Sequence, residues 1–241
     1  VIIPKSTVVE CVYGAAGITL KCAGDLTVSG GTLETTGTST ISGSLVNNGN
    51  VFINKGELTL SGGGEGSGDF SLKGAAHLKF AGGKRYTVDG KVDDLGSGSL
   101  TVSEAGTTVT FKDSCEAANV SCNNGASATW NGTTEVKAFN NFGSTVFNSD
   151  ITLYTLYSTG TIGGSGDITI SKVCSSNQGW RGGTIEGTGT LIIGPSGVFP
   201  LTGDGDKNLD RKLINNGTVN ILGGTCKFNE PVENRGRLSS I

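Results

Sequence analysis

Residues 164–170 read GSGDITI, and this phrase recurs with small changes along the chain. Residues 66–72 read GSGDFSL, residues 96–102 read GSGSLTV and residues 187–193 read GTGTLII. Each copy is a turn of Gly and Ser or Thr, followed by a short stretch rich in β-forming residues. Recurrent strand-and-turn units are typical of a β-solenoid, in which the chain winds coil upon coil. The sequence therefore predicts a stacked all-β architecture.

A second phrase is built on paired Asn residues and has three versions. Residues 47–51 read NNGNV, residues 140–146 read NNFGSTV and residues 215–219 read NNGTV. Asn and Gly tolerate left-handed backbone angles, so each can form a sharp corner between sheets. Equivalent Asn side chains can also hydrogen-bond along a stack and fix its register. We expect these phrases to be corners of the solenoid.

Between the turns, apolar and polar residues alternate with the period of a β-strand. From residue 26 to residue 111 the alternating stretches are separated by Gly-containing breaks, and no window shows helical periodicity. Two or three such strands per coil give roughly 18–25 residues per turn. We predict a single-stranded, right-handed parallel β-helix of about ten to twelve coils. A β-sandwich or barrel fits the same composition, but the literal recurrence of phrases favours stacked coils.

Two segments depart from this pattern. Residues 1–24 contain two β-forming stretches around GAAG at 14–17, which predict a hairpin-like first coil or a disulfide-closed N-terminal cap before a solenoid of residues 25–241. Residues 112–150 are the least regular part and predict a side loop. Residues 231–241 continue the repeat without a polar cap, so we expect further coils or an end that meets a partner.

Charge and hydropathy argue against two classes of partner. The net charge is −3, with 18 basic and 21 acidic residues scattered in sign, so no basic stripe exists to bind nucleic acid. No apolar run is long enough to predict a membrane span. The first residues lack the pattern of a signal peptide and the chain contains no Met, so we expect a mature chain whose leader was removed, or an excised segment.

The six cysteines predict an oxidising compartment. Their number is even, their spacing matches no zinc motif and the chain has one His, so we expect disulfides. Spacing favours two local pairs and leaves the third by default, although six cysteines allow many connectivities and buried free thiols are the alternative. The expected pairs are Cys11–Cys22, Cys115–Cys122 and Cys174–Cys226.

Three Asn-x-Ser/Thr tripeptides point to the same compartment. They begin at Asn119, Asn131 and Asn216. Asn119 and Asn131 lie in the irregular segment and are candidate glycosylation sites, whereas Asn216 fits a role in its own turn. We therefore expect an extracellular, secreted or cell-surface protein.

One acidic motif has the spacing of a Ca²⁺ loop, with oxygen ligands at alternate positions: Asp204, Asp206, Asn208 and Asp210. Lys207 adds positive charge inside the motif, and Asn215 stands where a calcium loop ends on Glu. These two features favour a plain polar turn over a Ca²⁺ site. No other cofactor is indicated.

A resemblance to known repeats covers about two thirds of the chain and is strongest in residues 160–225. Residues 180–193 (WRGGTIEGTGTLII), continued through 203–209 and 215–219, resemble repeats of adhesins, autotransporter passengers and similar extracellular fibrous proteins of the pectin-lyase-like fold class. This resemblance implies a right-handed parallel β-helix and, by analogy, a structural or adhesive role.

Enzymes of this architecture act on polysaccharides, and their residue pattern is missing. The resemblance implies a cluster of three Asp, a His and an Arg-x-Lys motif, but here Asp93–Asp94 is the only adjacent acidic pair and His77 stands alone. We read the acidic pair as a solvated turn, so we expect no enzyme. Trp130 and Trp180 could stack on sugars if exposed, although packing in the core fits them better.

These observations predict an extracellular structural protein, a subunit of a filament, sheath or adhesive surface that assembles through its solenoid ends. Its expected partners are further copies or other matrix and surface components. The alternative is a glycan-binding adhesin module with a shallow groove bearing Trp180 or Tyr154, and a polysaccharide lyase or hydrolase ranks third.

Overall fold

The structure is a computed structural model that describes residues 2–3, 8–11, 21–174 and 178–240. Within these residues every element is a β-strand and every strand pair is parallel. The chain forms a parallel β-solenoid of about 11 turns, which confirms the predicted all-β solenoid and its number of coils. The chain consists of two compact units, Val1–Gly132 and Thr133–Ile241.

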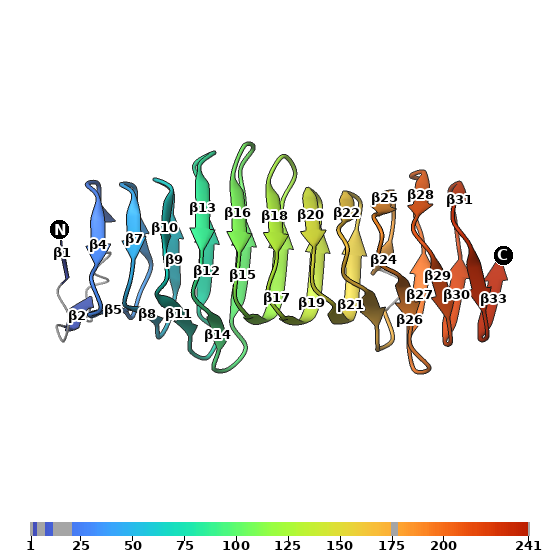
Figure 1. The fold of residues 1–241 in the computed structure, drawn as a ribbon, viewed down its shortest axis with the longest axis horizontal. Helices are drawn as coiled ribbons and strands as arrows, with labels where there is room; N and C mark the ends of the chain where they lie inside the picture. Colours follow the sequence, from blue (N-terminus) through green and yellow to red (C-terminus); the bar gives the residue numbers. More distant parts are fainter. Residues whose placement is uncertain (1, 4–7, 12–20, 175–177, 241) are drawn as a thin grey trace. The chain divides into compact units, whose positions relative to one another are not determined.

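In the first unit, three ladders of parallel strands run side by side along the stacked turns (Figure 1). Ladder A contains β1 (Ile2–Ile3), β4 (Leu26–Val28), β7 (Leu45–Asn47), β10 (Gly64–Gly66), β13 (Arg85–Val88), β16 (Thr108–Phe111) and β18 (Ser127–Trp130). Ladder B contains β2 (Val8–Cys11), β5 (Thr32–Thr35), β8 (Asn50–Ile53), β11 (Asp69–Leu72), β14 (Val92–Asp94) and the start of β17 (Cys115–Cys122). Ladder C contains β3 (Lys21–Cys22), β6 (Ser39–Ile41), β9 (Glu57–Leu60), β12 (His77–Phe80), β15 (Ser99–Val102) and the end of β17.

The second unit repeats the same three ladders. Ladder A contains β20 (Ser144–Phe147), β22 (Thr161–Gly163), β25 (Gly183–Glu186), β28 (Lys207–Asp210) and β31 (Cys226–Phe228). Ladder B contains the starts of β19 (Thr134–Asn141) and β21 (Ile151–Ser158), then β23 (Ile168–Ile170), β26 (Leu191–Ile193), β29 (Leu213–Asn215) and β32 (Val232–Asn234). Ladder C contains the ends of β19 and β21, then β24 (Gly179–Trp180), β27 (Val198–Leu201), β30 (Thr218–Ile221) and β33 (Arg237–Ser240).

The register gives the length of each turn. Equivalent residues of ladder A in the first unit are 19, 19, 22, 23 and 19 residues apart: Leu26, Leu45, Gly64, Tyr86, Val109 and Ala128. Those of the second unit are 17, 23, 24 and 19 residues apart: Thr145, Ile162, Ile185, Leu209 and Phe228. The predicted range of roughly 18–25 residues fits every turn except the shortest.

The core of each unit is a column of inward-facing side chains. Strands alternate buried and partly exposed positions. In β9, Leu58 and Leu60 are buried, whereas Glu57 and Thr59 face outward. Composition predicts an aliphatic interior, but aromatic rings also stack there. In the first unit the Phe80 ring lies 5.1 Å from Tyr86 and 5.9 Å from Phe111, whose ring stacks 5.3 Å from Trp130. Such pairs add about 0.5–1.5 kcal/mol each beyond area burial.

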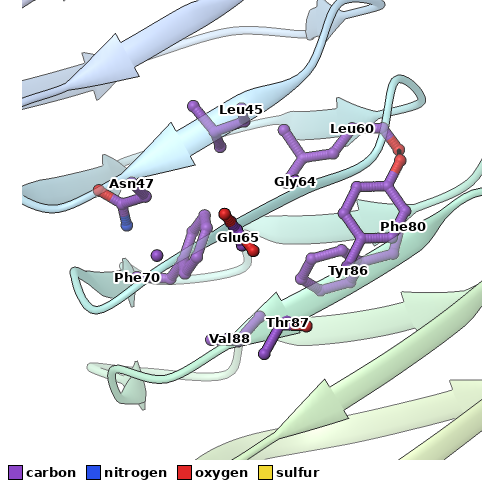
Figure 2. Close-up of a pocket in the computed structure, with 11 residues that line it drawn as sticks. Leu45, Asn47, Leu60, Gly64, Glu65, Phe70, Phe80, Tyr86, Thr87 and Val88 are labelled. Carbon is purple, nitrogen blue, oxygen red and sulfur yellow. Dashed lines mark hydrogen bonds between the residues drawn. The ribbon is translucent and has the colours of Figure 1, made fainter.

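A small internal cavity accompanies these rings. Gly64 of β10 pairs with Leu45 and Tyr86 on the adjacent turns, and Phe70, Phe80 and Tyr86 border the cavity beside it (Figure 2). The cavity measures about 10 Å³, which is room for one water at most. The Tyr86 hydroxyl lies 2.8 Å from the carbonyl oxygen of Leu60, and burial raises its pKa.

Buried Asn side chains form the predicted corners. In the first unit, Asn47 Oδ1 accepts a hydrogen bond from the backbone N–H of Gly49 at 3.2 Å, and its Nδ2 donates to the carbonyl of Asp69 on the next turn. In the second unit, Asn141 Nδ2 donates to the carbonyl of Thr161 at 3.0 Å. Each amide therefore joins two successive turns, which opposes slippage of the register.

The Asp of the repeated GSGD phrase joins turns from another corner. Asp69 Oδ1 accepts from the backbone N–H of Lys91, and Asp167 Oδ1 accepts from that of Thr190, each one turn further on. Asp94 accepts from Gly98 of its own turn and, through Oδ2, from Ala118 of the next. Asp94 therefore pins the backbone, and the interpretation of Asp93–Asp94 as a merely solvated turn was incomplete.

Two predictions about irregular segments differ from the structure. Residues 112–150 are not a side loop, because β17, β18, β19 and β20 occupy them in register with neighbouring turns. Near the N-terminus, β2 and β3 pair in parallel with β5 and β6 of the following turn and not with each other as a hairpin. The remaining cap residues, including 12–20, lie outside the described residues.

Candidate functional site

The turn formed by residues 222–240 exposes side chains that its predecessors bury. Leu238 of β33 is 45% exposed, whereas its register partner one turn earlier, Val219, is 1% exposed. Val232 of β32 is 41% exposed, against 2% for its partner Leu213. These positions are core positions in the earlier turn, and among the described residues nothing covers them here. We call Leu222, Val232, Leu238 and the outer edges of β31, β32 and β33 the terminal surface.

Polar groups join this turn to the one before it. Asn215 Nδ2 donates to Asn234 Oδ1 at 2.7 Å and to the carbonyl of Arg237 at 2.9 Å, both on the outer turn. Asn234 occupies the register position of Asn215, so the amide ladder expected from the Asn phrases is formed here. Such a ladder carries the same hydrogen-bonding pattern to whatever stacks next.

Charged residues border the terminal surface. Glu233 pairs with Arg235 and, at 3.3 Å, with Lys212. Hydrogen bonds from these two cations hold the pKa of the Glu233 carboxyl below its usual range, with the bond from Arg235 the larger cause. The surface therefore combines an apolar centre with a charged rim, which is the arrangement of many protein interfaces.

The sequence suggested that His77 stands alone. In the structure it lies within a chain of hydrogen bonds on ladder C. Its Nδ1 is 2.9 Å from Glu57 Oε2, and its Nε2 is 2.8 Å from Thr101 Oγ1. Thr59 Oγ1 donates to the other Glu57 oxygen at 2.7 Å. A carboxylate, an imidazole and a hydroxyl in this order resemble a hydrolase triad. However, the three lie on an outward strand face, where an ordinary cross-strand ladder accounts for every contact.

A polar groove of about 430 Å³ lies beside β10 in the first unit. Glu65 and the ion pair between Asp89 and Lys112, 2.9 Å long, line it, together with Asn48 and Ser67. Asn48 Oδ1 accepts a hydrogen bond from the backbone N–H of Ser67 at 3.3 Å. Carboxylates, an amide and hydroxyls converge here, and such groups can hydrogen-bond a hydroxyl-rich ligand.

The motif that resembles a Ca²⁺ loop surrounds the ammonium of its own lysine. Lys207 is fully buried, and its Nζ donates to the carbonyls of Gly203 at 3.1 Å, Gly205 at 2.8 Å and Gly223 at 3.0 Å. Asp210, one of the predicted ligands, accepts a hydrogen bond from the Asn229 side chain. The other three predicted ligands do not converge, since Asp204 and Asp206 are exposed and Asn208 faces outward on β28. The described residues contain no cluster of three or more His, Cys, Asp or Glu that could hold a metal.

Arg211 is a second buried cation that the sequence did not reveal. Its guanidinium reaches two earlier turns, donating to the carbonyls of Glu186 at 2.9 Å, Gly164 at 2.8 Å and Gly166 at 3.3 Å. Burial lowers the pKa of this side chain. Both cations bind backbone carbonyls at corners, so they join turns as the Asn and Asp residues do.

Cys22, Cys115, Cys122, Cys174 and Cys226 form no disulfide in the structure, so none of the three predicted pairs is shown. Cys115 pairs with Val92 on ladder B and Cys122 with Val102 on ladder C, so a corner at Ala117–Ala118 separates them, with about 7 Å of strand before it and about 13 Å after it. Cys174 and Cys226 lie two turns apart, about 10 Å along the stack, which a disulfide cannot span. For Cys11–Cys22, the Cys11 side chain lies outside the described residues, and Cys22 is free.

The remaining predicted residues fall on different parts of the surface and core. Asn119 on β17 and Asn131 in the following turn are exposed, whereas Asn216 is half-buried at its corner. Trp130 and Trp180 are each 1% exposed, so neither offers a face to a sugar. This corrects the placement of Trp180 in a glycan groove and confirms the expected packing role.

No protein-family model, curated protein or solved structure matches this chain. The described residues contain no helix that is long and apolar enough to cross a membrane.

Proposed function

We propose that this protein is an extracellular structural protein, a subunit of a filament, sheath or adhesive surface that assembles by stacking at solenoid ends. The observation that carries the proposal is the stack of parallel turns itself, in which each ladder repeats its strand from one turn to the next and buries core side chains such as Val219. Burying one core side chain of this kind between turns contributes about 1.5–3 kcal/mol. Pairing the unpaired strand edges removes a second cost, because open edges are prone to add strands.

The proposed occupant of the terminal surface is a turn from a second copy of this chain. A second copy carries the same three-ladder cross-section and the same corner phrases, so its strands can continue each ladder in parallel. The mixed charges of Glu233, Arg235 and Lys212 allow rim contacts of either sign. A head-to-tail contact of this kind repeats without closing and generates a filament.

A charge placed on the terminal surface tests this. Negative-stain electron microscopy and light scattering across a concentration series should show filaments for the native chain and single particles for Leu238→Asp. Thr152→Asp, at an exposed position of β21, is the matched control and should assemble normally. Circular dichroism confirms that both variants fold. Assembly of Leu238→Asp at the native concentration, or single particles of the native chain at every concentration, contradicts the proposal.

The extracellular location is part of the proposal and rests on the two exposed sequons at Asn119 and Asn131. The free thiols of the structure do not add to it. Intact mass of the protein from its native source, before and after enzymatic removal of N-linked glycans, tests this location. A right-handed winding is likewise proposed, because crossovers between parallel strands are overwhelmingly right-handed.

A glycan-binding adhesin module is the second candidate, and the groove at Glu65, Asp89 and Lys112 favours it. Tyr154, the other predicted groove residue, is 36% exposed with Lys172 Nζ 5.5 Å from its ring centre. A glycan array with the native chain and Asp89→Asn separates the two candidates. Binding that Asp89→Asn abolishes favours the adhesin, and an array without hits removes it. We propose no catalytic role, and a reducing-sugar assay on common polysaccharides tests that.

A further inference from the structure

The tripeptide Asn-Asn-Gly occurs three times, at residues 47–49, 123–125 and 215–217. An Asn followed by Gly is chemically reactive, because Gly has no side chain to shield its backbone nitrogen. That nitrogen loses its proton and attacks the side-chain carbonyl carbon of the Asn, and ammonia leaves as a five-membered succinimide closes. Water then opens the ring to Asp or isoaspartate. The reaction consumes one water, releases one ammonia and needs no oxidant or enzyme.

Two of the three copies are solenoid corners in which the attacking nitrogen is occupied. The backbone N–H of Gly49 donates to Asn47 Oδ1 at 3.2 Å, and that of Gly217 donates to Asn215 Oδ1 at 3.1 Å. Both acceptor residues are buried, with exposed fractions of 2% and 1%. Each acceptor is itself fixed by a bond from its Nδ2 to the next turn. Attack on Asn48 or Asn216 therefore requires the corner to open first.

The third copy has the same three residues in a different structure. Asn123 to Ala126 form a tight turn, closed by a hydrogen bond from the N–H of Ala126 to the carbonyl of Asn123 at 3.0 Å, with Gly125 at a φ of 77°. Asn124 and Gly125 are exposed. Among the described residues, the Gly125 N–H donates to no acceptor. The nitrogen that attacks is therefore not held by a hydrogen bond, and its residue is exposed.

We propose that Asn124 is a site of spontaneous deamidation and isoaspartate formation, and that the first Asn of each corner protects Asn48 and Asn216 from the same reaction. This inference is independent of the proposed function. Its product places a new negative charge, and in the isoaspartate form an extra backbone carbon, in the turn between β17 and β18. The corner Asn residues thus have a chemical role beside their structural one.

Peptide mapping by mass spectrometry after incubation of the folded chain at neutral to mildly alkaline pH in ¹⁸O-labelled water tests the proposal. The three sites are compared within one molecule, so each controls for the others. A retained backbone hydrogen bond of about 1.5 kcal/mol corresponds to about tenfold in rate. We expect label and isoaspartate to accumulate at Asn124 about tenfold faster than at Asn48 or Asn216.

The same chain in concentrated urea is the matched control. There the three rates should converge, because the tripeptides are identical and the corner bonds are lost. Asn124→Gln should remove the fast site without altering the other two, since a six-membered ring closes more slowly. Equal rates at all three sites in the folded chain would overturn the proposal. A difference that persists in urea would also overturn it, because sequence context and not the corner would then be the cause.

Discussion

Removing the buried ammonium of Lys207 tests whether the corner cations stabilise the solenoid. We consider Lys207→Met, which keeps an unbranched apolar stem of similar length. The native ammonium donates three hydrogen bonds to backbone carbonyls and is fully buried. Hydrogen bonds from a charged group contribute about 1.5–3 kcal/mol each. Burying an ammonium costs several kcal/mol, so these two terms largely offset each other.

The net effect of the substitution then comes from the carbonyls that are left behind. An unsatisfied buried carbonyl costs about 1–3 kcal/mol, but Gly205 is exposed enough for water to replace the lost donor. Gly203 and Gly223 are half-buried and recover less. We therefore expect Lys207→Met to lower the free energy of unfolding of the second unit by about 2–4 kcal/mol. With a urea slope of about 2 kcal/mol per molar, the middle of the usual range, the midpoint falls by about 1–2 M.

Urea titration followed by Trp180 fluorescence measures this, since Trp180 is buried in the second unit. A Trp130→Phe background removes the signal of the first unit, which is needed because stacked repeats need not unfold in one step. Lys227→Met, the same substitution at an exposed position, should change stability by less than about 0.5 kcal/mol. A midpoint for Lys207→Met equal to or above the native one would refute the reasoning.

Three further predictions concern Cys115, Gly66 and the pair of Glu57 and His77. Burial raises the pKa of the Cys115 thiol to about 12, so the stability that the neutral thiol contributes is complete below about pH 9 and is lost as the pH rises toward 12. Cys115→Ala should therefore flatten this alkaline decline in thermal denaturation scans. Gly66 has a φ of 151° and a Cβ there would lie 1.9 Å from the Asn47 carbonyl oxygen, so Gly66→Ala should cost about 3 kcal/mol or more, while Gly24→Ala, which meets nothing within 4 Å, should cost less than about 1 kcal/mol in the same urea assay. A double-mutant cycle on Glu57 and His77 should give a coupling of only about 0.2–1 kcal/mol at neutral pH, because both side chains are about a third exposed; a larger value would indicate a special arrangement.

The phrases that recur in the sequence predicted the fold because they mark the corners. Asn47 and Asp69 each bond to a neighbouring turn through a group that few residue types can supply, so the phrase is repeated wherever that corner recurs. The strands between them need only alternate apolar and polar residues. Turn length followed from the spacing of the phrases, which is why it was predicted within one residue of the observed range.

The sequence pattern of residues 112–150 predicts a side loop in place of the observed strands, and the reason is structural. β17, β19 and β21 each run eight residues across a corner, and no Gly or Asn stands at the bend, which lies at Ala117–Ala118 in β17, Lys137 in β19 and Tyr154 in β21. In β17 the alternation shifts phase at Ala117 and Ala118, both buried, so the strand period is broken without any break in the strand. A sequence pattern that identifies corners by turn residues cannot detect a corner of this kind, which lies inside a continuous strand.

The polar residues buried in the core were the hardest to predict, and they share one physical cause. Parallel ladders satisfy the backbone within strands, but every corner leaves carbonyl and N–H groups without ladder partners. Asn215 and Asp167 satisfy such groups with a side-chain donor or acceptor from a neighbouring turn. Lys207 and Arg211 satisfy them with a cation that hydrogen-bonds several carbonyls at once. A lysine within an acidic motif predicts a solvated or metal-binding loop only if its ammonium faces solvent. Here the apolar stem lies in the core and the ammonium reaches the corner, so the positive charge that argued against Ca²⁺ is bound by the loop carbonyls themselves.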